Sequence, residues 1–345
     1  MAKSISLHTR KEFLVQQKPS SAQQTHFKYK GHTYQVLEKI SIRGKTYLVV
    51  DKKGSRYKAF DVATQAWRSI RLRKGGVRYE MELMQFAKLR NNSLLYTFDY
   101  FKDNKSKTEY LVQEWVTGYN LRHYLRRKPG EQPPFTAERS YYLMRGLVNG
   151  LNRLHERNIF HGDIQPENLI VGDTNRLVMI DFGAAWSGAQ TKLRRDEKTR
   201  GYASPEQWAR ERLIDHRADQ FAASVVLYEM LTNELPYGGH GSFGADSTDH
   251  PRLVPPSKKN REVWRSLDEV IMKGLSLNKD DRYETSSAWV KEFNAAVPPR
   301  RTKPDIFLHY LSNGTVWEDV KAAITEARLR LKQALSSLRK RGNKR

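Results

Sequence analysis

The chain has 345 residues, of which 38% are hydrophobic, and it carries a formal net charge of +23 at pH 7. This length and apolar content predict a globular protein with a sizeable core. No run of about 18 apolar residues could span a bilayer, and no charged-then-apolar secretory leader is present, so we expect a cytoplasmic protein. The absence of cysteine excludes disulfides, thiolate metal sites and a cysteine nucleophile.

The first predicted elements are strands that follow a polar, basic arm. Residues 1–30 show no sustained periodicity, and we expect a flexible arm there. Three antiparallel strands are then predicted from short β-rich runs at residues 34–40, 46–50 and 56–62. A basic insert at residues 68–74 precedes apolar residues at helical spacing over residues 77–89. The pattern therefore indicates a small sheet backed by one helix.

Helical patterns dominate the rest of the chain. A strand at residues 110–112 and a connector at residues 114–116 come first. Long helices are then predicted at residues 137–157, 218–232 and 263–275. The expected fold class is α+β, with a sheet-containing N-lobe at residues 31–113 and a mainly helical C-lobe at residues 114–298.

Three short motifs carry the chemistry. Residues 161–168 read His-Gly-Asp-Ile-Gln-Pro-Glu-Asn, Asp181-Phe182-Gly183 begins eighteen positions after Asp163, and residues 203–206 read Ala-Ser-Pro-Glu. In phosphoryl transfer a carboxylate can orient the attacking hydroxyl, while an amide and a second carboxylate can hold Mg²⁺. The motifs in this order resemble the eukaryotic-type (Hanks-type) Ser/Thr protein kinase family, and the resemblance covers residues 32–298.

The resemblance implies a bilobal kinase fold and transfer of the γ-phosphate of ATP to Ser or Thr hydroxyls of a protein substrate. ATP and Mg²⁺ are the expected cofactors, with Mn²⁺ as the alternative ion. It implies that Asp163 is the catalytic aspartate and that Asn168 and Asp181 hold the metal. It also makes His161 a structural residue that packs against Phe182 rather than an acid or base.

The resemblance further assigns a nucleotide site. Lys58 is expected to be the phosphate-binding lysine, held by Glu82 of the predicted helix. The other residues assigned to this site are Gly44, Leu48, Glu114, Val116 and Ile170. The expected phosphate loop contains Gly44 as its one glycine, and Arg56 stands two before Lys58, where the family prefers a small residue.

Two further departures concern the catalytic loop. Gln165 replaces the lysine usual in Ser/Thr-specific members, and Gly162 replaces an arginine that pairs with a phosphorylated activation segment. Together with the sparse glycines they leave open a pseudokinase that acts as a scaffold. A small-molecule kinase related to aminoglycoside and choline phosphotransferases shares the His-Gly-Asp pattern. Residues 199–206, which resemble a peptide-docking segment, favour a protein substrate, and we expect Arg282 to pair with Glu206.

Positive charge is concentrated at both ends of the chain. Residues 300–345 hold twelve Lys or Arg against four Asp or Glu, and residues 1–30 hold six against one. We expect a basic C-terminal extension at residues 299–345 with an amphipathic helix, and a polyanion is a candidate partner of both arms. Arg122, followed by basic residues at 126–128, suggests an acidic or already phosphorylated substrate. The oligomeric state stays open.

Overall fold

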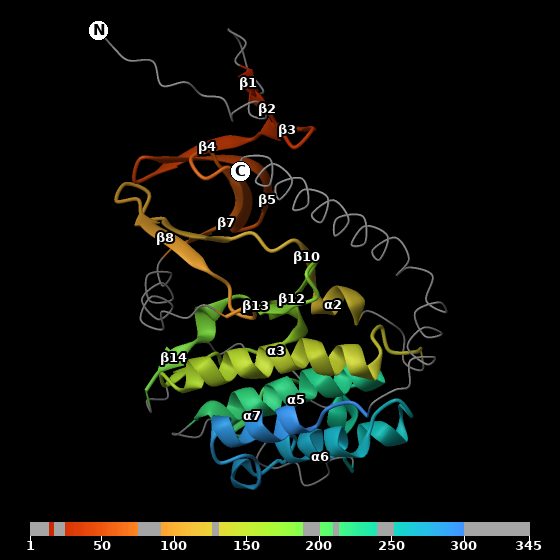
Figure 1. The fold of residues 1–345 in the computed structure, drawn as a ribbon. Coiled ribbons are helices and arrows are strands. Elements are labelled where there is room, and N and C mark those ends of the chain that lie inside the picture. The colour runs from red at the N-terminus through yellow and green to blue at the C-terminus, as the bar shows by residue number, and fades with distance from the viewer. Residues whose placement is uncertain are drawn as a thin grey trace, which may run out of the picture. The chain divides into compact units, whose positions relative to one another are not determined.

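The structure is a computed structural model that describes residues 14–16, 25–74, 91–125, 131–188, 201–209, 214–239 and 252–299. The chain divides into two compact units, Met1–Val297 and Pro298–Arg345. In the first unit a strand-rich part precedes a helical part along the chain (Figure 1). Within the described ranges, no helix combines the length and the apolar character needed to cross a membrane.

An antiparallel six-stranded sheet forms the centre of the strand-rich part. Its strands, in spatial order, are β4 (Glu38–Ile42), β5 (Lys45–Lys53), β6 (Arg56–Asp61), β7 (Ala66–Arg73), β9 (Glu109–Glu114) and β8 (Thr97–Lys102). The sheet is strongly curved, since Arg43 in the β4–β5 turn lies 3.2 Å from Asp99 of β8 at the other edge. Val49, Ile70 and Val112 are fully buried on one face of the sheet.

Strand β7 corrects the prediction of a basic insert at residues 68–74. The residues pair with β6 on one side and β9 on the other, and two of the arginines within them have carboxylate partners. Arg68 lies 3.7 Å from Asp61, and Arg71 lies 2.8 Å from Asp181. A run of charges that would read as a solvated loop is therefore a central strand.

A second sheet includes residues 14–16 and 25–29, which lie within the segment predicted to be a flexible arm. Its strands are β1 (Leu14–Gln16), β2 (Thr25–Tyr29) and β3 (His32–Val36), in that order. Phe27 of β2 is 1% exposed, and its ring centroid lies 5.0 Å from that of Phe60 in β6. Phe60 in turn packs 5.2 Å from Trp67 of β7. Aromatic packing against the larger sheet thus orders this part of the arm.

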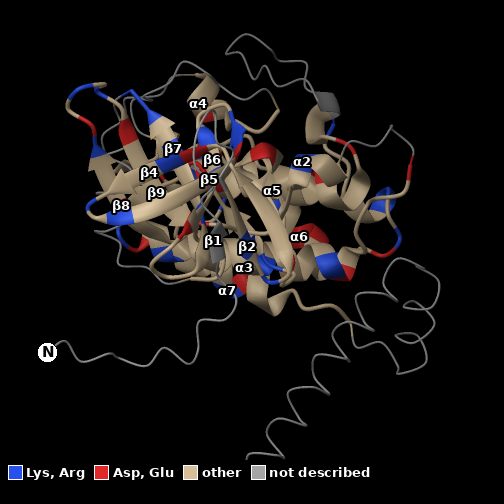
Figure 2. Cartoon of the chain, turned by 90° about the horizontal axis from the view of Figure 1, so that it is seen from above, with Lys and Arg blue, Asp and Glu red and all other residues tan. Residues whose placement is uncertain are grey.

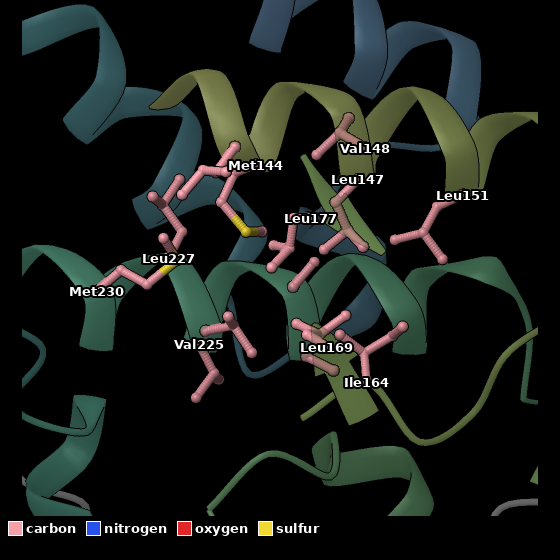
Figure 3. Close-up of a cluster of buried hydrophobic side chains, with 14 of the residues drawn as sticks. Met144, Leu147, Val148, Leu151, Ile164, Leu169, Leu177, Val225, Leu227 and Met230 are labelled. Carbon is pink, nitrogen blue, oxygen red and sulfur yellow. The ribbon is translucent and has the colours of Figure 1, made fainter. Parts of the chain in front are cut away.

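The helical part is built around two long helices, as the sequence predicts. The helices are α2 (Leu121–Tyr124), α3 (Ala137–His155), α4 (Pro205–Trp208), α5 (His216–Thr232), α6 (Arg265–Gly274) and α7 (Ser286–Ala295). Thr136 begins α3 by accepting a hydrogen bond from the N–H of Arg139. Met144, Leu147 and Leu151 of α3 point toward α5, whose Leu227 and Met230 lie on the side that faces α3 (Figure 3). Helix α5 is buried from Ala218 to Leu231, so it forms the axis of this core.

Short elements near α3 carry the sequence motifs. Strand β10 (Gly118–Asn120) pairs with β12 (Leu169–Gly172), which pairs with β13 (Leu177–Met179). Strand β11 (Ile159–Phe160) pairs with β14 (Trp186–Ser187). The 3-10 helices η1 (Pro166–Asn168) and η2 (Phe182–Ala184) complete the two motif loops. Residues 161–168 and 181–183 are therefore held at the ends of paired strands. The helix predicted at residues 77–89 lies outside the described residues.

A buried ion pair joins α4 to the segment before α7, as the sequence predicts. Arg282 Nη1 donates to Glu206 Oε1 at 2.7 Å, and Arg282 Nη2 donates to Glu206 Oε2 at 2.9 Å. The two side chains are 0% and 2% exposed. Arg282 Nε also donates to the carbonyl of Ser276. Such a bidentate pair is stable only while both charges are present.

We predict that Glu206→Gln lowers the free energy of unfolding by about 3–5 kcal/mol, because it leaves the Arg282 charge buried without its counter-ion. Urea denaturation would measure the loss. Glu269→Gln is the matched control, since Glu269 pairs with Arg265 while 62% exposed. The control should change stability by less than about 1 kcal/mol. Equal effects of the two substitutions would contradict a structural role for the buried pair.

Candidate functional site

The side chain of Asp163 is fixed from two sides by its own loop. Asn168 Nδ2 donates to Asp163 Oδ2 at 2.7 Å and to the Asp163 carbonyl at 2.9 Å. Gln165 Nε2 donates to Asp163 Oδ1 at 2.8 Å. Gln165, which the sequence analysis treats as a lost cation, therefore orients the carboxylate. A carboxylate held this way is suited to positioning a hydroxyl and accepting its proton.

Helix α5 supports this loop through a buried carboxylate. Asp219 is 1% exposed and accepts hydrogen bonds from the backbone N–H groups of His161 at 2.9 Å and Gly162 at 2.8 Å. His155 Nε2 lies 2.8 Å from the same carboxylate. Burial alone would raise the pKa of Asp219. His155, His161 and the Gly162 N–H have a larger, opposite effect, so the pKa lies below its usual value. Asp219 therefore stays ionised as an acceptor for the loop.

Packing around His161 and Gly162 fixes the shape of the loop. His161 is fully buried, and its ring centroid lies 4.8 Å from that of Phe182, in agreement with the predicted structural role. Gly162 has φ +73°, and a Cβ at this position would lie 2.2 Å from Cζ3 of Trp186. The loop therefore leaves no space for the arginine that the resemblance expects at Gly162.

Asp181 stands at the start of η2, and one oxygen of its carboxylate accepts the hydrogen bonds that hold it there. Its Oδ1 accepts hydrogen bonds from the Gly183 N–H at 3.2 Å and from Arg71 Nη1 at 2.8 Å. Burial raises the pKa of Asp181, but Arg71, the Gly183 N–H and Arg56 together bring it below its usual value. The carboxylate is therefore ionised, and its side chain remains 32% exposed.

Asn168 and Asp181 each keep one side-chain oxygen that could bind a divalent cation. Both hydrogen bonds of Asn168 use Nδ2, and both of Asp181 use Oδ1. Among the described residues, Asn168 Oδ1 and Asp181 Oδ2 have no hydrogen-bond partner. No group of three or more His, Asp or Glu within the described ranges could hold a metal by itself. Phosphate and water would therefore have to supply the other oxygens that Mg²⁺ needs.

The cation beside Asp181 is Arg71, which corrects the prediction of Lys58. Lys58 lies on β6, with its ammonium 4.7 Å from the ring centroid of Trp67 and 4.9 Å from that of Trp115. Arg71 lies on the neighbouring strand β7, is 5% exposed and reaches Asp181. Ser69 stands two residues before Arg71, so the small residue that the family prefers there is present after all.

The assignment of Gly44 and Leu48 to the nucleotide site is corrected for the same reason. Strand β5 begins next to Gly44 and ends near Gly54, so the turns at its two ends lie far apart along the strand. The turn near Arg71 is the one at Gly54, where the Leu72 N–H donates to the Ser55 carbonyl at 2.7 Å. Leu48 is buried in the aromatic cluster with Phe27 and Phe60 rather than at this end.

The remaining predicted nucleotide residues lie around the connector. Val116 is buried with Leu95, Val178 and Ile180, and Ile170 packs against this cluster. Glu114, the last residue of β9, lies 3.3 Å from Arg176. The structure thus brings Val116 and Ile170 together between the strand-rich and helical parts. Glu82 lies outside the described residues.

Arg122 is paired with side chains of the protein itself. Its Nη1 donates to Glu229 at 2.6 Å, its Nε donates to Glu167 at 2.9 Å, and its Nη2 donates to Tyr202. Figure 2 shows basic and acidic segments interspersed over the strands and helices. Of the two terminal arms, residues 1–13, 17–24 and 300–345 are not described. The predicted acidic substrate therefore loses Arg122 as support.

Sequence reasoning missed Arg71, although a signal was present. Residues 66–73 directly precede the predicted helix at 77–89, and Ile70 alternates there with polar residues. In the resemblance, the strand with the phosphate-binding cation precedes that helix.

The known proteins to which this chain is similar are protein kinases. The family described as "Protein kinase domain" matches residues 43–293. Serine/threonine-protein kinase PknB of Mycolicibacterium smegmatis is 30% identical over 220 residues, which cover 61% of this chain and 34% of that protein. PknB of Mycobacterium leprae is 30% identical over 238 residues (66% and 37%), and PrkC of Bacillus subtilis is 27% identical over 229 (65% and 34%). The chain thus spans about a third of the length of these relatives.

We predict that Gly162→Ala destabilises the protein more than Gly44→Ala. Both glycines have positive φ, +73° and +76°, but only Gly162 meets Trp186, while a Cβ at Gly44 meets nothing within 4 Å. Gly44→Ala should cost about 1–2 kcal/mol for backbone strain. Gly162→Ala should cost about 1–3 kcal/mol more, because the ring must move. Urea denaturation of both variants checks this, and equal losses would show that Trp186 yields freely.

Proposed function

Because this chain belongs to the protein kinase domain family, we propose that it transfers the γ-phosphate of ATP to Ser or Thr hydroxyls of a protein substrate. The observation that carries the proposal is the Asp163 carboxylate, held by Gln165 on Oδ1 and by Asn168 on Oδ2. Phosphoryl transfer asks a protein mainly for positioning and for charge stabilisation. This carboxylate meets the first requirement without any change of rotamer.

The roles of the other residues follow from their places. Asp163 would orient the substrate hydroxyl and accept its proton as the new bond forms. Arg71 would contact the phosphates, and Asn168 and Asp181 would hold Mg²⁺ through Oδ1 and Oδ2. When bound, Mg²⁺ supplies positive charge that offsets the negative charge on the phosphates. Val116 and Ile170 would line the adenine side of the site.

The substrate class rests on relatives and on one segment. The similar proteins are named serine/threonine-protein kinases. Residues 201–206, which resemble a peptide-docking segment, are tied to the core by the Glu206–Arg282 pair, and this supports a protein over a small molecule. Cytoplasmic location, an acidic substrate, a polyanion partner and the domain limits at residues 30, 113 and 298 stay predictions from the sequence.

We predict that Asp163→Asn lowers phosphate transfer by about 100- to 10,000-fold, because the amide cannot accept the hydroxyl proton. The assay follows labelled phosphate from ATP and Mg²⁺ onto the chain itself and onto a panel of acidic and basic proteins. Asp173→Asn, on an exposed residue, is the matched control and should retain wild-type transfer.

Two results of this assay would count against the proposal. Label on small molecules but not on proteins would favour the small-molecule phosphotransferase. ATP binding without transfer to any acceptor would favour the scaffold, which Arg71 at the lysine position and the turn with the single glycine Gly54 also suggest.

A second prediction separates Arg71 from Lys58. Arg71→Met should reduce transfer at least about 100-fold, because the phosphates lose their charged contact. Lys58→Met should retain transfer to within about tenfold, since the ammonium contacts the rings of Trp67 and Trp115. These cation–π contacts stabilise the fold by about 0.5–2 kcal/mol. Arg71→Lys should recover part of the activity. The reverse order of effects would restore the assignment of Lys58.

A further inference from the structure

A second arginine faces the same site as Arg71. Arg56 is the first residue of β6, directly after the turn at Gly54-Ser55, and its ladder partner on β7 is Arg71. Partners directly opposite on antiparallel strands project from the same face of the sheet. Since Arg71 reaches Asp181 at 2.8 Å, Arg56 shares the face that looks onto Asp181.

This arrangement is unfavourable without a ligand. Like charges directly opposite each other repel, and Arg56 is half-buried. Within the described part of the chain its guanidinium forms no hydrogen bond or ion pair. The Asp181 carboxylate attracts both arginines, but its hydrogen bond goes to Arg71. The Asp181 carboxylate is therefore shared by two guanidiniums, and Arg56 is left without an ion pair among the described residues.

We propose that Arg56 is a second phosphate-binding residue, which forms with Arg71 a two-guanidinium receptor for the phosphates of the nucleotide. This inference rests on the proposed function and deepens it. A guanidinium presents a planar fork that binds two phosphate oxygens at once.

The neighbouring turn gives the reason for a second cation. Glycine-rich loops bind phosphate through backbone N–H groups, because no Cβ keeps the phosphate away. Residues 51–56 of this chain read Asp-Lys-Lys-Gly-Ser-Arg, with Gly54 as the one glycine. A Cβ at Gly54 would meet nothing within 4 Å, so the turn stands open beside Arg56. Side-chain charge thus stands where Cβ atoms limit the approach of phosphate to the backbone amides.

The receptor should select ligands by phosphate rather than by base. Loss of Arg56 should therefore weaken the binding of ATP and ADP strongly and that of AMP less, and it should leave the binding of adenosine unchanged. Calorimetric titration of the full chain with these four ligands in the presence of Mg²⁺ measures the pattern. For Arg56→Gln we expect the Kd of ATP to rise about 10- to 100-fold, as for loss of a charged hydrogen bond, with adenosine within about twofold.

Arg43→Gln is the matched control. It removes the same charge from an arginine that is 66% exposed at the far end of β5, so all four affinities should stay within about twofold. If Arg56→Gln does not fold, Arg56→Lys decides, because lysine keeps the charge but loses the fork. We expect it to weaken ATP about three- to tenfold and to spare adenosine.

The outcomes separate this inference from the proposed function. Unchanged ATP affinity in the Arg56 variant, or equal weakening of ATP and adenosine, overturns the receptor while leaving the kinase proposal intact. A wild-type chain that binds no ATP overturns both. A phosphate-dependent loss in a chain that transfers no phosphate supports the receptor and counts against the kinase.

Discussion

The candidate site depends on one buried carboxylate, that of Asp219. This carboxylate accepts hydrogen bonds from the N–H groups of His161 and Gly162. Asp219 belongs to α5, the most deeply buried of the described helices. A loop has no hydrogen-bond ladder of its own, so its backbone must find acceptors elsewhere. Because the acceptor belongs to the centre of the apolar core, the position of Asp163 is set by the packing of α3 against α5 rather than by the loop alone.

The second constraint is the contact between Arg71 and Asp181, which links β7 to the helical part across 110 positions of sequence. Burying the guanidinium of Arg71 is unfavourable, and the ionised carboxylate of Asp181 offsets that penalty in part. A metal held by Asp181 Oδ2 would lie on the same carboxylate that Arg71 contacts through Oδ1. The pair therefore couples the state of the site to the placement of the sheet.

Much of the helical part could be predicted, because its signals are local. The spacing of Asp163, Asn168 and Asp181 within two short motifs places them in one site, and the long helices follow from apolar periodicity. The strand-rich part was harder. Choosing between Lys58 and Arg71 requires the order of strands in the sheet, and pairing between strands is a long-range property that residue type does not reveal. The aromatic contacts of Phe27 with β6 and β7 could not be predicted for the same reason.

The aromatic residues of β2 and β3 also bear on what counts as a domain. The family match begins at residue 43, yet Phe60 and Trp67 inside it are covered by Phe27, Tyr29 and Tyr34 outside it. A fragment cut at the homology boundary would expose a patch of large rings to water. The region that matches the family and the region whose aromatic side chains pack together thus have different amino-terminal limits in this protein.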